Sequence, residues 1–149
     1  MSETIKKITV TLQTATQERG ERTFKRRVGV EGDSKVYLGI AGREFSCRLA
    51  GNKVPFQPGD SNTFVFGGDP NVLDAPINDP QNIPLAEVKP HPVYIRFEPH
   101  PYDDDNWCLE RAEVVVEASG KPLRLHAVAL DGEATIWLGR ESGHTVHLA

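Results

Sequence analysis

Residues 93–116 read VYIRFEPHPYDDDNWCLERAEVVV, two runs of apolar residues at every second position separated by an acidic turn. In the first run Val93, Ile95 and Phe97 share one face, and Val114 opens the same alternation in the second. Because successive side chains of a strand point to opposite sides of a sheet, each run predicts a half-buried β-strand. This stretch therefore indicates two strands joined by a polar loop.

The same period of two recurs along the rest of the chain. The apolar members of the other runs are Ile8, Val10 and Leu12; Val36, Leu38 and Ile40; Phe45, Cys47 and Leu49; Phe64 and Phe66; Leu123, Leu125, Ala127 and Ala129; Ile136 and Leu138; Val146 and Leu148. No segment carries the 3.6-residue apolar period of a helix. A sheet with one apolar face has to cover it with another sheet, so we expect an all-β antiparallel sandwich of about eight strands.

The composition is that of an ordinary globular domain. The chain has 149 residues, of which 38% are hydrophobic and 26% charged, which predicts one domain over residues 1–149. The net charge of −4 and the lack of basic clusters beyond residues 25–27 argue against nucleic acid as a partner. No apolar stretch is long enough to cross a bilayer, and the first residues lack the apolar core of a signal peptide. We therefore expect a cytoplasmic protein without a transmembrane segment, with leaderless export left open.

Two cysteines, Cys47 and Cys108, lie in strand-like runs beside apolar neighbours. The simplest interpretation is a pair of buried free thiols, as a reducing compartment favours. A disulfide between them stays open, because spacing alone does not exclude it. Neither is part of a CxxC pair or lies beside an evident base, which argues against a catalytic thiol.

Residues 67–92 form an unusually long connection that contains six of the eleven prolines. Connections of this length without secondary structure are uncommon and tend to be functional. Leu73 and Ile77 are its apolar candidates for contact with a membrane or a partner. Acidic residues surround both, so an anionic lipid surface would repel this loop unless a cation lay between them.

Four segments in order resemble one known family. They are GDSKVYLGIAGREFSCRL at 32–49, FQPGDSNTFVF at 56–66, the stretch 93–116 quoted above, and ATIWLGRESGHTVHL at 134–148. Together they are similar to the PLAT/LH2 domain, the C2-like β-sandwich of lipoxygenases, pancreatic-type lipases and bacterial phospholipase C toxins. The resemblance implies a PLAT-like sandwich in which the connection 67–92 is an insertion.

The resemblance also implies a calcium site between two loops. Carried over to this chain, its ligands are Gly32, Asp33, Asp103, Asp104, Asp105 and Asn106. The chemistry is suitable, because calcium takes six to eight oxygens from carboxylates, carbonyls and water. The chain departs from the pattern at Lys35, where the family has a second aspartate. A solvated acidic turn without a metal is the alternative.

These observations predict a non-catalytic binding or targeting module. We expect calcium to order the acidic loop and to assist docking to an anionic lipid surface or a protein partner. Tyr102, at the start of that loop, joins Leu73 and Ile77 as a candidate contact residue. One alternative is a metal-free adaptor that binds another protein through the proline-rich connection. Another is a small enzyme in which His100 and a neighbouring aspartate exchange protons.

Overall fold

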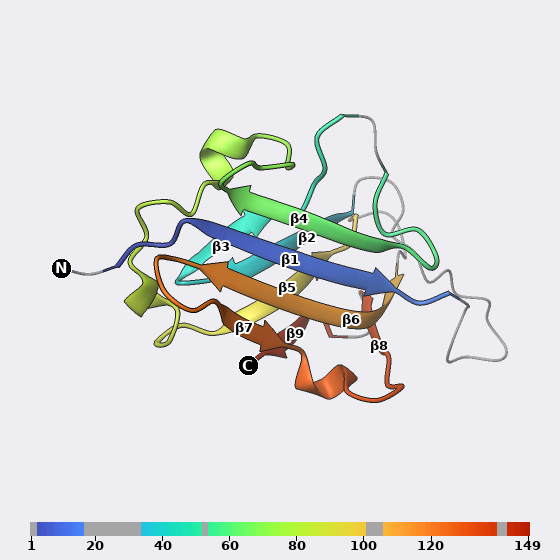
Figure 1. Cartoon of the computed structure of the whole chain (residues 1–149). Coiled ribbons are helices and arrows are strands. Elements are labelled where there is room, and N and C mark those ends of the chain that lie inside the picture. Colours follow the sequence, from blue (N-terminus) through green and yellow to red (C-terminus); the bar gives the residue numbers. More distant parts are fainter. Residues whose placement is uncertain (1–2, 17–33, 52–53, 101–105, 140–142) are drawn as a thin grey trace, which may run out of the picture.

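The computed structural model describes residues 3–16, 34–51, 54–100, 106–139 and 143–149, and these form two antiparallel β-sheets (Figure 1). Their strands are β1 (Lys7–Thr14), β2 (Lys35–Ile40), β3 (Arg43–Ser46), β4 (Ser61–Gly67), β5 (Val93–Glu98), β6 (Asn106–Glu117), β7 (Leu123–His126), β8 (Ile136–Gly139) and β9 (Thr145–Leu148). Short 3-10 turns are η1 (Ala75–Asn78), η2 (Leu85–Glu87) and η3 (Val128–Leu130). The predicted all-β antiparallel sandwich is confirmed.

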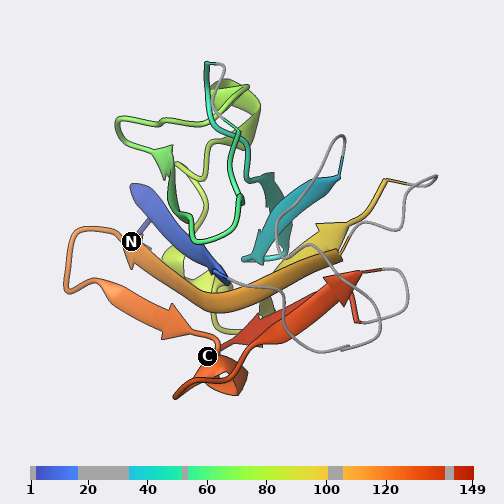
Figure 2. The same cartoon turned by 90° about the vertical axis from the view of Figure 1, so that its right-hand side faces the viewer.

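One sheet has the strand order β4-β1-β6-β7, with β8 also paired to β6, and the other has the order β3-β2-β5-β9. In Figure 1 the first sheet lies in front of the second, and Figure 2 shows the two from the side. The twelve residues of β6 serve two partners on one side, because its first residues pair with β8 and its last with β7. β4 and β3 therefore lie at one lateral edge of the sandwich, and β7 and β9 at the other.

The core forms where the alternating apolar residues of both sheets face each other. Val10, Leu38, Ile95 and Val114 are each fully buried, as their place in the alternation predicts. Burying one such side chain stabilises the fold by about 1.5–3 kcal/mol relative to leaving it in water. This term holds the sheets together.

Trp107 is the largest fully buried side chain. Its ring packs against Phe56 and Phe97, with centroid separations of 4.9 and 6.0 Å. The indole Nε1–H donates a 2.8 Å hydrogen bond to Oγ1 of Thr14, which is itself fully buried. A polar atom of the indole is thereby paired inside the core, where an unpaired donor is costly.

Two predicted strands end earlier than their alternation indicated. β7 stops at His126 because the chain then turns into η3, where the carbonyl of Ala127 accepts the N–H of Leu130. Ala127 and Leu130 are buried there and Ala129 is exposed, a spacing of three in place of two. β3 likewise ends at Ser46. Leu49, predicted to continue that strand, forms an isolated bridge with Val72.

The other predictions on the core concern the cysteines and the absence of a membrane helix. Cys47 and Cys108 are free and buried, as predicted. Burial raises the pKa of the Cys47 thiol far above its usual range. None of the helical turns in the described ranges is long and apolar enough to cross a bilayer.

The connection 67–92 is more ordered than its composition predicts. It contains η1 and η2, and it is bridged to Leu49 through Val72 and to Thr4 through Pro84. Along its course Val72, Ile83 and Val88 are buried. The connection first runs beside the edge made by β3 and β4, then crosses to the edge made by β7 and β9 (Figure 1). It is an integral part of the sandwich.

Candidate functional site

The stems of the two predicted calcium loops lie at one end of the β2–β5 sheet. Lys35, the first residue of β2, is opposite Glu98, the last residue of β5. Beyond this pair, the N–H of His100 donates a 3.1 Å hydrogen bond to Oγ of Ser34. Ser34 directly follows the first predicted loop and His100 precedes the second, so their described flanks are in contact.

The start of β6 follows the second predicted calcium loop and is the third described segment next to the two loops. Asn106, a predicted ligand, is the first residue of β6, and its backbone is opposite Gly139 of β8. The ring contact between Phe97 and Trp107 shows that the end of β5 and the start of β6 are close. The remaining predicted ligands, which are Gly32, Asp33, Asp103, Asp104 and Asp105, lie outside the described residues, as does Tyr102. Within the described ranges, no three His, Cys, Asp or Glu side chains are grouped closely enough to hold a metal.

The predicted contact residues of the long connection lie along the lateral edge of the sandwich. Ile77 is 82% exposed and Leu73 is 38% exposed. The N–H of Leu73 donates to the carbonyl of Arg48, which follows β3. Both residues therefore flank β3, while the stems of the acidic loops lie at the ends of β2 and β5.

The buried side-chain amide of Asn78 holds the segment that carries Leu73 and Ile77 in place. The carboxamide oxygen of Asn78 accepts the N–H of Ser46 at 2.9 Å, and its Nδ2 donates to the carbonyl of Asp74 at 3.1 Å. Asn78 is only 8% exposed, and Asp74 adopts a left-handed backbone with φ of 55°. A side-chain amide that replaces backbone partners in this way holds an irregular segment in one conformation. Leu73 and Ile77 are thus presented by a rigid segment.

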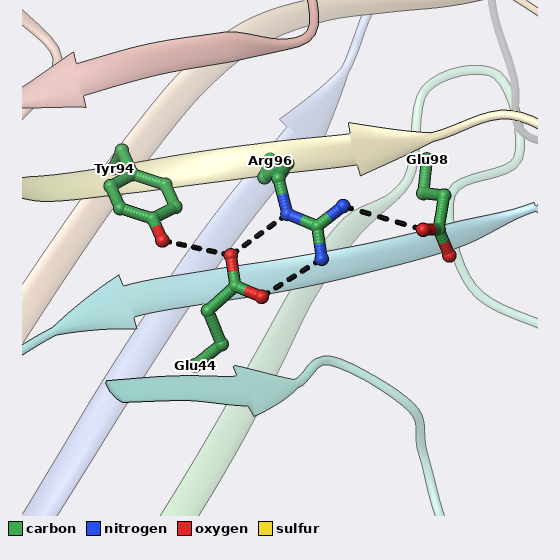
Figure 3. Close-up of polar contacts among 4 residues, drawn as sticks. All are labelled: Glu44, Tyr94, Arg96 and Glu98. Atoms are coloured by element: carbon green, nitrogen blue, oxygen red, sulfur yellow. Dashed lines mark hydrogen bonds and ion pairs between the residues drawn. The ribbon is translucent and has the colours of Figure 1, made fainter. Parts of the chain in front are cut away.

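A polar cluster on the outer face of the β3-β2-β5-β9 sheet was not predicted (Figure 3). Glu44 of β3 accepts hydrogen bonds of 2.8 Å from Nε and Nη2 of Arg96, one to each carboxylate oxygen, and a third of 2.8 Å from the Tyr94 hydroxyl. Nη1 of Arg96 lies 3.5 Å from Glu98. The Arg96 guanidinium also stacks over the ring of Tyr37, 4.4 Å from its centroid.

The charges of this cluster satisfy one another. Hydrogen bonding to Arg96 holds the pKa of Glu44 below its usual value and raises that of Arg96. Burial and then the neighbouring Glu44 raise the pKa of Tyr94. A bidentate pair of this geometry is stronger than a typical surface ion pair. We conclude that the cluster ties the edge strand β3 to β5 across β2, and that its carboxylate is already occupied.

Glycine at position 39 makes room for this arrangement. Gly39 lies on β2 opposite Tyr94, and a Cβ added to it would fall 2.1 Å from the Tyr94 ring. The ring therefore covers the backbone of the glycine. The outward positions of Tyr94, Arg96 and Glu98 follow from the alternation in β5, so the sequence did place them on one face. It held no signal that paired them with Glu44.

Comparison with known proteins identifies the fold. No family model matches the sequence, and no curated protein matches it. Among solved structures, the alpha-toxin of Clostridium absonum matches with a TM-score of 0.54 and 17% identity over 100% of this chain and 32% of the toxin chain. The alpha-toxin from the avian strain SWCP of Clostridium perfringens matches with a TM-score of 0.53 and 17% identity over 97% of this chain and 31% of that one.

The chain thus spans about a third of the length of these toxins. The matched portion is their C-terminal region, which is a β-sandwich of the PLAT type. At 17% identity this likeness concerns the fold and not the activity. The chain has the PLAT-like β-sandwich fold of the C-terminal region of clostridial alpha-toxins.

Proposed function

We propose that this protein is a non-catalytic binding module that docks to an anionic lipid surface with the help of calcium. The ion would be held by Asp33, the aspartates 103–105 and carbonyls of the same loops. Three adjacent carboxylates repel one another, and a divalent cation relieves that repulsion. The same cation can bridge the loop to a phosphate or carboxylate of the surface.

The observation that carries the proposal is the hydrogen bond between His100 and Ser34. A calcium site built from two loops requires their stems to meet, and these flanking residues are in contact at one end of the sheet. The opposite positions of Lys35 and Glu98 support the same geometry. The PLAT-like fold supports it too, because the proposed ligands come from the resemblance to that family.

The exposed pair of the long connection lies beside β3, the neighbour of β2, and β2 carries the stem of the first predicted loop. Ser46, which Asn78 anchors, is opposite Tyr37, two residues along β2 from Lys35. Two residues of a strand span about 7 Å. Ile77 and Leu73 lie beside β3, along the lateral edge of the sheet, where they would add apolar contacts to an ion-mediated one if the surface covered both this edge and the loop stems.

Lys35 is expected to weaken calcium binding. It is exposed and begins β2, one residue from Ser34. A positive charge near a cation site opposes binding, and the family pattern has an aspartate there. We therefore propose a weak site, in the range of about 10⁻⁴–10⁻³ M that serves extracellular modules.

The experiment is a calcium titration followed by the melting temperature. Binding to the native state alone raises the midpoint in proportion to the logarithm of the calcium concentration. Asp104→Asn should abolish this increase and Lys35→Asp should enlarge it. Asp79→Asn, an exposed aspartate in the long connection, is the matched control and should leave the increase unchanged. An unchanged midpoint at millimolar calcium would refute the metal site.

Sedimentation with vesicles tests the docking step. Vesicles containing phosphatidylserine should pull down the protein in calcium and release it in chelator, and neutral vesicles should not. Ile77→Ser should reduce the bound fraction without changing the melting temperature, because the residue is 82% exposed. Equal binding in chelator would remove calcium from the mechanism.

The second candidate is a metal-free protein adaptor. It is favoured by the rigid presentation of Leu73 and Ile77, since a preorganised apolar pair loses little entropy on binding a protein. In that case Ile77→Ser would abolish partner binding, and neither calcium nor vesicles would have an effect.

A further inference from the structure

An apolar groove of about 890 Å³ opens at the edge made by β7 and β9. One wall is the segment 85–93, which includes η2, and the other is β7. The side chains on the walls and floor are aliphatic and are contributed by Leu85, Val88, Val93, Leu123, Leu125 and Leu148. In Figure 1 η2 and β7 lie on the same side of the sandwich, beside the C-terminus.

The long connection packs closely against one lateral edge of the sandwich and leaves an open groove at the other. At the β3–β4 edge the long connection lies against the sandwich, with Val72 buried and Asn78 bonded to Ser46. At the β7–β9 edge the same connection stands off, and Leu123 is left 40% exposed. Exposed aliphatic side chains that line a concavity mark a binding site more often than scattered ones do.

The volume and the lining residues of the groove indicate which kind of ligand fits it. The volume lies within the range of about 300–1,000 Å³ of small-molecule sites. His91 is the sole aromatic residue among those that line the groove, so the groove offers little surface for stacking a planar ligand. A flexible hydrocarbon chain fits such a lining, because its burial depends on area and not on orientation.

An added peptide strand fits less well. His126 of β7 already exchanges two backbone hydrogen bonds with Ala149, of 3.1 and 3.0 Å. Since the backbone groups of a strand alternate between its two sides, Arg124 is the remaining residue of β7 that faces outward with His126. One residue is too short a ladder for strand addition, which depends on a row of main-chain hydrogen bonds.

The charged residues at the groove indicate which polar head group a bound hydrocarbon chain would carry. Lys89 lines the groove and is exposed, and it has no ion-pair partner among the described residues. The carboxylate of Glu3 is engaged elsewhere, by the hydroxyl and N–H of Ser119 and the N–H of Gly120, and these bonds lower its pKa. His91 is paired with Glu87 through its ring Nδ1. Lys89 is thus the group free to meet an anion.

We infer that the groove binds a monomeric single-chain amphiphile with a carboxylate head, a free long-chain fatty acid, with the chain along the aliphatic walls and the carboxylate at Lys89. This binding requires no calcium and is independent of the docking proposed above.

The probe is sodium dodecanoate below its micellar concentration, measured by calorimetry and by methyl NMR in chelator. Saturable binding should shift the methyl signals of Leu85, Leu123, Leu125 and Leu148 and leave those of Ile77 in place. Affinity should rise from octanoate to dodecanoate by up to about fourfold per methylene, since each buried CH₂ contributes about 0.8 kcal/mol. Absence of saturable binding would overturn the proposal.

Three variants make the test specific. Lys89→Gln should weaken dodecanoate about two- to fivefold, the effect of an exposed ion pair, and should leave dodecanol binding unchanged. Leu123→Gln should weaken both ligands. Val128→Gln, an aliphatic side chain that is 55% exposed on η3 and outside the groove, should weaken neither.

Other occupants give different results. Binding to phosphatidylcholine vesicles that depends on Leu123, without binding of monomeric dodecanoate, would show that the groove takes bilayer lipid and would overturn the proposal. A dimer in sedimentation that Leu123→Gln dissociates would overturn it in favour of a second copy of the chain.

Discussion

Arg96 donates two hydrogen bonds to Glu44, one to each carboxylate oxygen, across the intervening strand β2. The pair joins the edge strand β3 to β5, so the outer face of one sheet is held by charge while its inner face is held by apolar packing. An edge strand of four residues has few backbone contacts of its own. Side-chain contacts of this kind are what keep such a strand in place.

Glu44→Gln should lower the free energy of unfolding at neutral pH by about 1 kcal/mol, since a well-oriented bidentate pair is lost. The pKa of Glu44 is lowered in the folded state, so its contribution is present above the unfolded value of 4.5 and is lost as the pH falls through the folded value. The difference between wild type and variant should therefore shrink in denaturant titrations below about pH 4.5.

Glu113→Gln is the control for this pH dependence. Glu113 is half exposed and lies 3.9 Å from Arg111, a geometry that contributes little to stability. Its substitution should change the unfolding free energy by less than about 0.5 kcal/mol at every pH. An equal effect of both substitutions would mean that the Glu44 pair is an ordinary surface contact.

Gly39→Ala should displace the Tyr94 ring, because the new methyl group would lie 2.1 Å from it. The ring can move away, but its hydroxyl then loses Glu44, so we expect a destabilisation of about 1–2 kcal/mol. In a Tyr94→Ala background the same substitution should cost little. A double-mutant cycle measures this coupling, and additive effects would contradict the packing described for the ring.

Thr14→Val keeps the shape of a buried side chain and removes the acceptor for the Trp107 indole N–H. An unpaired buried donor costs about 1–3 kcal/mol, which chemical denaturation would detect. Thr11→Val, in the same strand, removes an exposed hydroxyl that bonds Thr63 at 3.3 Å. This control should be neutral, and a neutral Thr14→Val would show that the buried hydrogen bond contributes nothing.

Asn78→Ala should release the segment around η1 while the sandwich stays folded. The carboxamide oxygen accepts the N–H of Ser46 and so ties the segment to β3, whereas the carbonyl of Asp74 also accepts the backbone N–H groups of Ile77 and Asn78 and keeps these partners. We expect faster hydrogen exchange at the Ser46 amide and faster proteolysis within residues 71–78. Ile77→Ala, in the same turn but without a buried contact, should leave both rates unchanged.

Cys47 and Cys108 should not react with a thiol reagent in the native protein. Both are buried, and the raised pKa of Cys47 keeps it a thiol, whereas the thiolate is the reactive form. Two equivalents should react on unfolding in denaturant. Rapid modification of the native protein at neutral pH would contradict the burial of these side chains.

The fold class could be predicted because it depends on local periodicity. The alternation in residues 93–97 and in residues 8–12 states which side chains are buried, whatever the partner strand is. Where the spacing of buried residues changes from two to three, after Ala127, the predicted extent of the strand was wrong. Ala127 and Ala129 continue the alternation of β7 in sequence, but the chain turns into η3 after Ala127, and a hydrogen bond from the N–H of Leu130 to the carbonyl of Ala127 closes that turn.

The sequence by itself determined the fold class, the position of most strands and the two acidic loop segments, because each follows from residue type and spacing along the chain. The tertiary structure decided what those segments meet. Strand register brought Ser34 to His100 and Glu44 to Arg96, which are 66 and 52 residues apart. The tertiary structure also placed the proline-rich connection along both lateral edges of the sandwich. Pairings of this kind depend on which strands become neighbours, and no local pattern encodes that choice.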